Sequence, residues 1–390
     1  MQAKIDPRKI EELLSRGVEE VIDRNHLKER LMAGKKLRIK FGVDPTKPDL
    51  HLGHAVVLRK LKEFQELGHS VVFIIGDFTA QIGDPSGRMG ARTPLTPKEV
   101  LQNAKTYLGQ VGKILDMKKI ELVRNSKFLS KMSFAELFHL SQFFTVNQMM
   151  ERDMFQKRKE KEKPIWLHEF FYPVLQAYDS VQTKSDVEIG GNDQLFNMLA
   201  GRTLQPYFKQ SPQDVIATKL LIGTDGKQKM SKSLGNYIGI TERPLDQYGK
   251  IMSISDELIK GYFELCTDVP LFEIENLPPR NAKAKLAGEI VKIYHGEKAA
   301  ELADKEFERV FRDKELPTEI PKVAIKEGVL SILDLLVETK LCPSKSEAKR
   351  LVEQGGVEID GNIKKNWREQ IEIKQGQIIR AGKRKFIEII

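Results

Sequence analysis

Residues 37–76 place a strand, a helix and a second strand in succession, and this pattern restricts the fold more than any other. Residues 37–43 (LRIKFGV) are mostly apolar and run into an Asp-Pro turn, while residues 71–76 (VVFIIG) form a continuous apolar run typical of a strand buried on both faces. Between them, residues 54–67 carry apolar side chains at helical spacing, and Gly68 follows as a C-terminal punctuator. Two strands joined in this way predict a right-handed βαβ unit.

The rest of the chain continues this alternation and then changes character. Further strands are expected at residues 120–124, 187–190 and 215–222, and helices at 97–115, 134–155 and 194–204. The fold class is therefore α/β, with a Rossmann-like open parallel sheet covered by helices on both faces. We assign this Rossmann-like domain to residues 1–236.

The remaining residues predict two smaller domains. Helices expected at 245–252, 256–265 and 282–294 indicate an α-helical domain over residues 237–316. Pro317, Pro321 and Gly328 punctuate a linker, residues 317–329. Residues 330–390 then predict a small α+β domain, with helices at 332–338 and 344–354 and strands at 357–359, 371–374, 377–380 and 386–390.

Composition narrows the class of protein. No apolar run approaches the length of a membrane span, and the first fifteen residues lack the pattern of a targeting segment. The two cysteines, Cys266 and Cys342, have no metal-binding spacing, so neither a disulfide framework nor a zinc site is expected. These features favour the cytoplasm and no membrane contact. The net charge of +9 permits a nucleic-acid partner, although an ordinary basic protein explains it equally well.

Two short motifs carry groups suited to phosphate. His51 and His54 flank Gly53 at the start of the expected helix, where the helix dipole favours negative charge. Thr46, after the Asp44-Pro45 turn, adds a hydroxyl donor. A single histidine at such a place is more often an ordinary structural residue, and only the combination with a second motif favours function.

The second motif is a loop, residues 223–235, in which Lys229 and Lys232 lie three residues apart. Mobile cations of this kind suit a loop that closes over a triphosphate, whereas alone they indicate a solvated basic turn. Gly191, Asp193 and Gln194 follow an expected strand, where glycine allows close backbone approach and an acidic side chain can hold ribose hydroxyls.

Together, the motifs His51-Leu-Gly-His54 and Lys229-Met-Ser-Lys232-Ser resemble the nucleotide-binding signatures of class I aminoacyl-tRNA synthetases. The resemblance implies that a carboxylate is activated with ATP, with Mg²⁺ carried by the nucleotide and no metal bound by the protein. Catalysis would rest on positioning and electrostatic stabilisation by His51, His54, Lys229, Lys232 and Thr46, while Gly53, Gly191, Asp193, Gln194 and Arg88 hold ATP and the adenylate.

Two more segments, Gly83-Asp-Pro-Ser-Gly-Arg88 and Tyr172-Pro-Val-Leu-Gln176-Ala-Tyr-Asp179, resemble motifs of bacterial tyrosyl-tRNA synthetases. This resemblance implies that Asp84, Tyr172 and Gln176 hold the amino group of tyrosine and that Asp179 accepts a hydrogen bond from its phenol. The helical spacing of Tyr172, Gln176 and Asp179 places all three on one face of a helix. One departure stands out: Lys40 occupies the place of a tyrosine that contacts the phenol in many members.

The C-terminal segment resembles a small RNA-binding fold that ends bacterial tyrosyl-tRNA synthetases. Residues 330–390 contain 12 Lys/Arg and 9 Asp/Glu, and Ser344 is expected to cap a helix that carries Lys345, Lys349 and Arg350. The resemblance implies that these three side chains contact tRNA(Tyr). An appended α+β domain with a mixed-charge surface and no RNA partner would have a similar sequence pattern. It also implies a homodimer, for which the apolar stretch 134–150 is a candidate interface.

Three other functions remain open at this point. A tryptophanyl-type synthetase shares the two nucleotide motifs but ordinarily lacks a carboxylate at Asp179. A non-catalytic RNA-binding factor could retain the synthetase scaffold, but it has no physical need for both histidines and both lysines. A ligase that acylates another acceptor would not need the C-terminal segment.

Overall fold

The computed structural model describes residues 3–86, 95–311, 316, 320–326, 328–382 and 385–390. The chain forms two compact units, residues 1–300 and 301–390. The first unit holds both the sheet and the helices that follow it. The finer division proposed above, with boundaries at 236, 316 and 329, stays a prediction.

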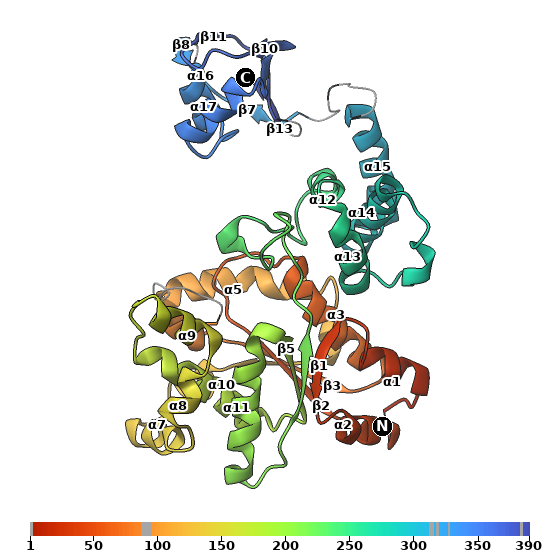
Figure 1. Cartoon of the computed structure of the whole chain (residues 1–390), viewed down its shortest axis with the longest axis vertical. Helices are drawn as coiled ribbons and strands as arrows, with labels where there is room; N and C mark the ends of the chain where they lie inside the picture. Colours follow the sequence, from red (N-terminus) through yellow and green to blue (C-terminus); the bar gives the residue numbers. More distant parts are fainter. Residues whose placement is uncertain (1–2, 87–94, 312–315, 317–319, 327, 383–384) are drawn as a thin grey trace. The chain divides into compact units, whose positions relative to one another are not determined.

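The first unit is built on a six-stranded sheet in the order β1-β6-β5-β2-β3-β4 (Figure 1). The strands are β1 Val18–Ile22, β2 Arg38–Val43, β3 Ser70–Ile75, β4 Ile120–Arg124, β5 Val187–Gly191 and β6 Asp214–Thr218. The five strands from β6 to β4 are parallel, which confirms the predicted α/β class. The order reverses between β2 and β5, and ligands of such sheets bind at the carboxyl ends of the strands at this switch point.

The sheet is not wholly parallel, because β1 pairs with β6 in the antiparallel direction. We did not predict this edge strand. Its sequence (VEEVI) exposes both glutamates, so it lacks the continuous apolar run that marks the inner strands. β3 has that run, and five of its six residues are buried.

Helices cover both faces of the sheet. The helices of this part are α1 Pro7–Leu13, α2 Arg24–Met32, α3 Leu52–Glu66, α4 Thr79–Ile82, α5 Pro97–Val111, α6 Ser126–Leu129, α7 Phe134–Ser141, α8 Val146–Met150, α9 Asp153–Glu160, α10 His168–Thr183 and α11 Leu195–Leu204. α10 and α11 lie on the opposite side of the strands from α1 and α2 in Figure 1, and α11 packs against β5 and β6. α3 packs against β3 and β5.

The single helix expected at residues 134–155 was wrong, because this stretch forms α7, α8 and the start of α9. Thr145 explains the break. Its side chain accepts a hydrogen bond from the backbone N–H of Gln148, and the Gln148 side chain accepts from the Thr145 N–H. This reciprocal capping box starts a new helix, and its Thr-x-x-Gln pattern is visible in the sequence.

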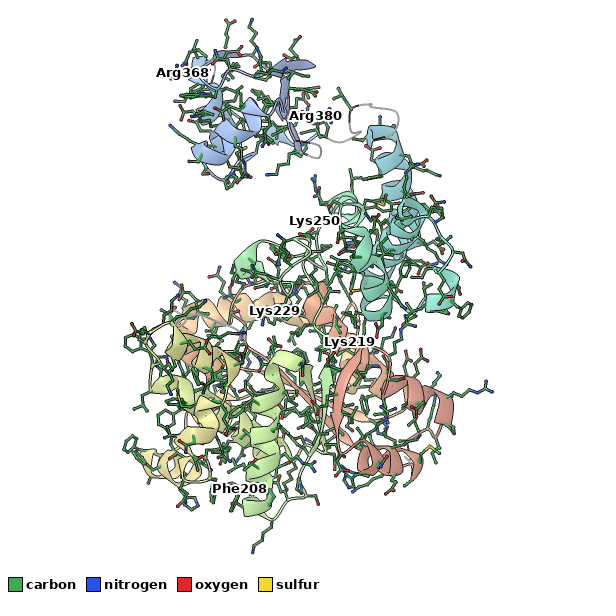
Figure 2. All side chains as sticks on the ribbon, in the orientation of Figure 1. Phe208, Lys219, Lys229, Lys250, Arg368 and Arg380 are labelled. Atoms are coloured by element: carbon green, nitrogen blue, oxygen red, sulfur yellow. The ribbon has the colours of Figure 1, made fainter. Side chains whose placement is uncertain are left out.

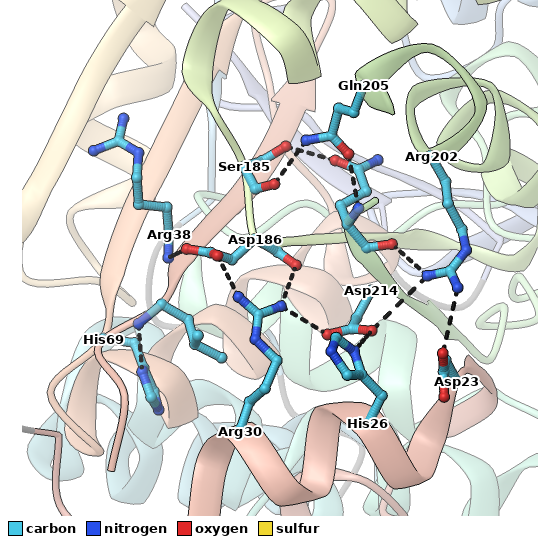
Figure 3. Close-up of polar contacts among 12 residues, drawn as sticks. Asp23, His26, Arg30, Arg38, His69, Ser185, Asp186, Arg202, Gln205 and Asp214 are labelled. Carbon is cyan, nitrogen blue, oxygen red and sulfur yellow. Dashed lines mark hydrogen bonds and ion pairs between the residues drawn. The ribbon is translucent and has the colours of Figure 1, made fainter. Parts of the chain in front are cut away.

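A polar network ties together the amino ends of the strands (Figure 3). Asp214, at the start of β6, is fully buried and accepts hydrogen bonds from Arg30 of α2 at 3.0 Å and from the His26 ring at 2.8 Å. Arg30 also pairs with Asp186, which precedes β5 and accepts the backbone N–H of Arg38 at the start of β2. The network therefore fixes α2 to three strands at the end of the sheet opposite the carboxyl ends.

The first unit continues into helices α12 Pro244–Met252, α13 Ile259–Cys266 and α14 Pro279–His295, after which α15 Glu297–Phe311 begins. α12 and α13 both pack against α14, and α13 contacts α3. Buried Tyr262 of α13 donates a hydrogen bond to the carbonyl of Ile222, in the segment after β6. The predicted helical character of this region is confirmed. No helix in the described part of the chain is both long and apolar enough to cross a membrane.

The second unit contains two small sheets and two further helices. Its elements are β7 Lys322–Val323, β8 Gly328–Ser331, α16 Ile332–Glu338, α17 Lys345–Glu353, β9 Val357–Ile359, β10 Asn362–Lys364, β11 Gln370–Ile373, β12 Ile378–Ala381 and β13 Lys385–Ile389. The larger sheet has the order β10-β9-β12-β13-β7, and β11 pairs with β8. Ser331 and Ser344 cap α16 and α17 by accepting backbone N–H groups. Leu335, Ala348 and Ile379 belong to its buried core.

Candidate active site

A cavity of about 1140 Å³ opens at the carboxyl ends of the parallel strands in the first unit. It lies where the strand order reverses between β2 and β5, and the segment after β6, which holds Lys219 and Lys229 of Figure 2, also lines it. Of the site residues predicted from the sequence, it is lined by Thr46, His51, Gly53, His54, Asp84, Tyr172, Gln176, Asp179, Gly191, Asp193, Gln194 and Lys229. Segments far apart in the chain therefore meet around one space.

His51 and His54 lie at the first turn of α3 with their ring centroids 3.9 Å apart. The backbone N–H of His51 donates to Nδ1 of His54 at 3.3 Å. Burial, together with the positive charges of Lys232 and Lys229, lowers the pKa of His54 to about 3. The same causes, together with His54, hold the pKa of His51 far below its usual range. Both rings are therefore neutral at pH 7, and His54, accepting at Nδ1, presents its proton on Nε2.

Backbone pairing fixes the loop that carries Lys229 and Lys232. The N–H of Met230 donates to the carbonyl of Leu221, and the N–H of Ser231 donates to the side chain of Asn236. Nζ of Lys229 lies 2.5 Å from Oδ2 of Asp193, in the turn after β5. Lys232 is not among the lining residues; its Nζ lies 3.4 Å from the carbonyl of Lys47, and desolvation lowers its pKa to about 8.

A second group of lining side chains is acidic or phenolic. Tyr172 donates its hydroxyl to Oδ2 of Asp44 at 3.0 Å, and burial raises its pKa well above the usual value. Asp84 accepts from the Gln194 amide at 2.7 Å and from the backbone N–H of Ser86. These contacts leave carboxylate and phenol oxygens facing the cavity, which is the polarity that a cationic amino group requires.

Asp179 lies deeper, on the same face of α10 as Tyr172 and Gln176. Burial raises the pKa of its carboxyl to about 7, while the nearby charge of Lys40 opposes this shift. The amide of Asn125 is 3.4 Å from Oδ2, and Oδ1 has no hydrogen-bond partner among the described residues. A buried acceptor without a partner is costly unless a ligand satisfies it, so Asp179 is suited to receive a donor from a bound molecule.

Several lining residues were missed by the sequence analysis. Asp44 was noticed only as part of a turn, and Glu188 was not singled out, although both line the cavity. The signal for Glu188 was available, since an acidic residue inside the apolar strand VEIGG needs a buried partner. That partner is Lys40, which is fully buried with its Nζ 2.9 Å from Oε1 of Glu188. Arg88 lies outside the described residues.

One group elsewhere in the described chain, formed by Asp23, His26 and Asp214, has the types of side chain that hold metals. The contacts of Asp214 argue against this use. One of its oxygens already accepts from Arg30, and Arg202 approaches the other at 3.9 Å. Because two guanidinium groups occupy the surroundings, the cluster fits a structural ion-pair network better than a cation site.

Comparisons with known proteins identify the family of this chain. Residues 32–312 match the model of "tRNA synthetases class I (W and Y)", and residues 313–389 match that of the "Tyrosine--tRNA ligase SYY-like C-terminal domain". The tyrosine–tRNA ligase of Thermotoga maritima is 52% identical over 97% of this chain and 96% of its own length. That of Moorella thermoacetica is 48% identical over 97% and 94%. This chain belongs to the tyrosine–tRNA ligase family.

Membership of the tyrosine–tRNA ligase family makes the chain an aminoacyl-tRNA synthetase, and it resolves the alternatives left open by the sequence. Solved structures share the fold as well. A mitochondrial tyrosyl-tRNA synthetase from Aspergillus nidulans covers 78% of this chain and 94% of its own at a TM-score of 0.65 and 23% identity. A tyrosyl-tRNA synthetase from Archaeoglobus fulgidus, complexed with L-tyrosine, covers 77% and 100% at a TM-score of 0.62 and 23% identity.

The predicted tRNA-contacting residues of this family member lie on α17 of the second unit. Lys345 and Arg350 are exposed, and Lys349 is half-buried. Lys345 pairs with Asp334 at 2.5 Å, and Nζ of Lys349 lies 4.3 Å from the ring centroid of Trp367. Arg368, labelled in Figure 2, lies 4.6 Å from the same ring. Cations and an aromatic ring together form a surface of the kind that contacts RNA backbone and bases.

Proposed function

We propose that this chain joins tyrosine to tRNA(Tyr) in two steps at the cavity described above. In the first step a tyrosine carboxylate oxygen attacks the α-phosphorus of ATP, forming tyrosyl-adenylate and breaking the bond to pyrophosphate. In the second step a hydroxyl of the terminal ribose of the tRNA attacks the tyrosyl carbonyl and AMP leaves. Mg²⁺ enters as the partner of ATP. The cytoplasm is the proposed location.

One observation carries the proposal: a single cavity joins phosphate-binding donors to an acidic pocket. His51, His54 and Lys229 lie at one part of it, where neutral imidazole N–H groups and an ammonium can stabilise charge on the transferring phosphates. We assign Lys232 and Thr46 to the same task. Gly53, Gly191, Asp193, Gln194 and Arg88 are proposed to hold ATP and the adenylate.

The acidic pocket is proposed to hold tyrosine. Asp84, Tyr172 and Gln176 would receive its ammonium group, and the unpartnered oxygen of Asp179 would accept a hydrogen bond from its phenol. A pocket built around a hydroxyl penalises phenylalanine, because the acceptor then stays buried and unpaired.

ATP–pyrophosphate exchange with each of the twenty amino acids, without tRNA, tests this assignment. We expect exchange with tyrosine alone. Exchange with tryptophan would keep the chemistry and overturn the role of Asp179, whereas no exchange from a folded protein would contradict the proposal. His54→Ala should slow exchange without weakening tyrosine binding, because His54 faces phosphate and not the amino acid.

A homodimer is proposed from the surface of α7 and the segment that follows it. Phe134 and Phe138 form an edge-to-face pair and are 76% and 58% exposed, and Val146 is 67% exposed. Clustered exposed apolar side chains on a globular protein mark an interaction surface. Sedimentation equilibrium tests this: Phe134→Lys/Phe138→Lys should yield monomers, and a wild-type monomer at micromolar concentration would contradict the proposal.

A further inference from the structure

A buried network of side chains closes the inner end of the cavity, next to Asp179. Lys40 of β2 and Glu188 of β5 lie at its centre and are 0% and 2% exposed. Gln176 and Ser180 of α10 and Gln213, which precedes β6, all donate hydrogen bonds to Glu188. Lys40, Gln176, Asp179 and Glu188 all line the cavity.

The donors and acceptors at the centre of this network are matched. The ammonium of Lys40 has three protons and three acceptors: the Gln176 carbonyl at 3.1 Å, the Ser180 hydroxyl at 2.7 Å and Glu188 Oε1 at 2.9 Å. Lys40 therefore has no proton left for a bound molecule.

Glu188 is satisfied in the same way. Its Oε1 accepts from Lys40 and from the Gln176 amide at 3.1 Å, and its Oε2 accepts from the Ser180 hydroxyl at 3.1 Å and the Gln213 amide at 2.5 Å. A carboxylate offers about four acceptor sites, and four donors occupy them. Neither member of the pair is free to bind a ligand, although both reach the wall of the cavity.

We propose that Lys40 and Glu188 are positioning residues for the selection of tyrosine, because their ion pair locks α10 so that Gln176 and Asp179 face the amino acid in one geometry. The inference rests on the proposed function. The side chain of Gln176 is oriented by Glu188, while its backbone carbonyl is held by Lys40. Ser180, next to Asp179 in the chain, is held by both. A shift of α10 would therefore break three or more hydrogen bonds at once.

The pair also sets the charge around Asp179. Lys40 lowers the pKa of Asp179, whereas the negative charges of Glu188 and Asp44 raise it, and burial raises it most. Tyr172, on the same helix, also interacts with Asp179, and Asn125 donates to it from the end of β4. An ionised Asp179 can only accept hydrogen bonds. It therefore favours tyrosine, whose ring carries a hydroxyl, over phenylalanine, whose ring carries a hydrogen atom at the same position.

Two single variants test the inference through the pH dependence of kcat/KM for tyrosine in pyrophosphate exchange. In the wild type we expect kcat/KM to rise as Asp179 ionises near its pKa of about 7. Lys40→Met removes a cation and should move this inflection to higher pH. Glu188→Gln removes an anion and should move it to lower pH. Opposite movements are the expected result, since a purely structural role would affect both variants alike.

In either single variant, the remaining charge of the pair is buried without its partner and could prevent folding. A double variant avoids this problem. Lys40→Met/Glu188→Gln removes both charges, and we expect it to lower the tyrosine-to-phenylalanine ratio of kcat/KM by about tenfold or more. The control is Lys60→Met/Glu63→Gln, which removes another ion pair, held at 2.8 Å between a buried lysine and a half-buried glutamate of α3, that does not line the cavity. The control should leave the ratio within about twofold of the wild type.

The outcomes separate this inference from the proposed function. A wild type that does not exchange pyrophosphate with tyrosine contradicts the function itself. An active wild type overturns only the role of the ion pair if both single variants move the inflection in the same direction. An unchanged ratio in the folded double variant, or an equal fall in the control, overturns it as well.

Discussion

Nζ of Lys229 lies 2.5 Å from Oδ2 of Asp193, which joins the loop after β6 to the turn after β5. The two residues were expected to serve different parts of ATP, phosphate and ribose. Under the proposed roles, ATP binding would replace this ion pair with contacts to the nucleotide. We therefore expect the pair to couple the position of the loop to the filling of the ribose site.

We expect Lys229→Met to slow adenylate formation by about 100- to 1,000-fold, since an ammonium that stabilises developing phosphate charge is removed. Rapid-quench measurement of the first turnover checks this. Combination with Asp193→Asn should be non-additive by about 0.5–3 kcal/mol, because the two side chains share an interaction. Strictly additive effects would show that the contact has no part in the reaction.

The rate should also depend on the protonation of Lys232. Desolvation lowers its pKa to about 8, and only the protonated form carries positive charge. Adenylate formation should therefore fall as the pH rises through about 8. Lys232→Arg should remove this decline, because a guanidinium stays protonated. A decline that persists in the arginine variant would assign it to another group.

Asp179→Asn should relax discrimination against phenylalanine. The amide keeps the size of the side chain but carries no charge and offers one acceptor oxygen in place of two, so the hydrogen bond to the phenol is weakened. We expect kcat/KM for tyrosine to fall by about 100-fold or more while the value for phenylalanine changes little. Pyrophosphate exchange with both amino acids measures this, and an unchanged ratio would move phenol recognition away from Asp179.

Gly201 of α11 should not tolerate a methyl group. A Cβ at this position would lie 2.6 Å from both the Gln213 amide nitrogen and the Ser180 hydroxyl. Gly201→Ala should therefore lower the free energy of unfolding by about 1–3 kcal/mol. Gly288→Ala in α14 is the control, because no described atom beyond the neighbouring backbone of its own helix lies within 4 Å of a Cβ there, and it should be neutral or stabilising. Urea denaturation of both variants compares them.

The α17 surface should act on tRNA and not on tyrosine activation. Replacing Lys345, Lys349 and Arg350 with alanine should spare pyrophosphate exchange and weaken aminoacylation. The salt dependence of tRNA binding should lose up to about three units of slope, since each phosphate contact contributes about 0.7–0.9. Alanine at Lys62, Lys118 and Lys119, exposed in the first unit, provides a charge-matched control. Equal losses in both triple variants would assign the effect to net charge.

Local patterns predicted much of the fold. The apolar run of β3 and the glycine at residue 68 after α3 predicted the bounds of these two elements to within a few residues. Both signals are local, because they depend on burial and on helix termination. β1 was missed because an exposed antiparallel edge strand has no continuous apolar run. The break at Thr145 was missed because apolar spacing was given more weight than a capping box.

Site residues could be predicted where they lie close together in one sequence motif, as His51 and His54 do. They could not be predicted where the fold brings together two buried residues that are distant in sequence. Lys40 was noted as a departure from the family pattern, but its partner Glu188 lies on another strand, and only the sheet order brings β2 beside β5.

The first turn of α3 is completed from far downstream in the chain. The backbone N–H of Leu52 donates to the carbonyl of Ile238, and His51 forms a β-bridge with Gly239. During synthesis the two histidines are therefore made early but lack their final supports until residues 238 and 239 have left the ribosome. Because translation proceeds at about 5–20 residues per second, this delay lasts on the order of ten seconds or more. A nascent chain in that interval would be an incomplete enzyme, unable to consume ATP.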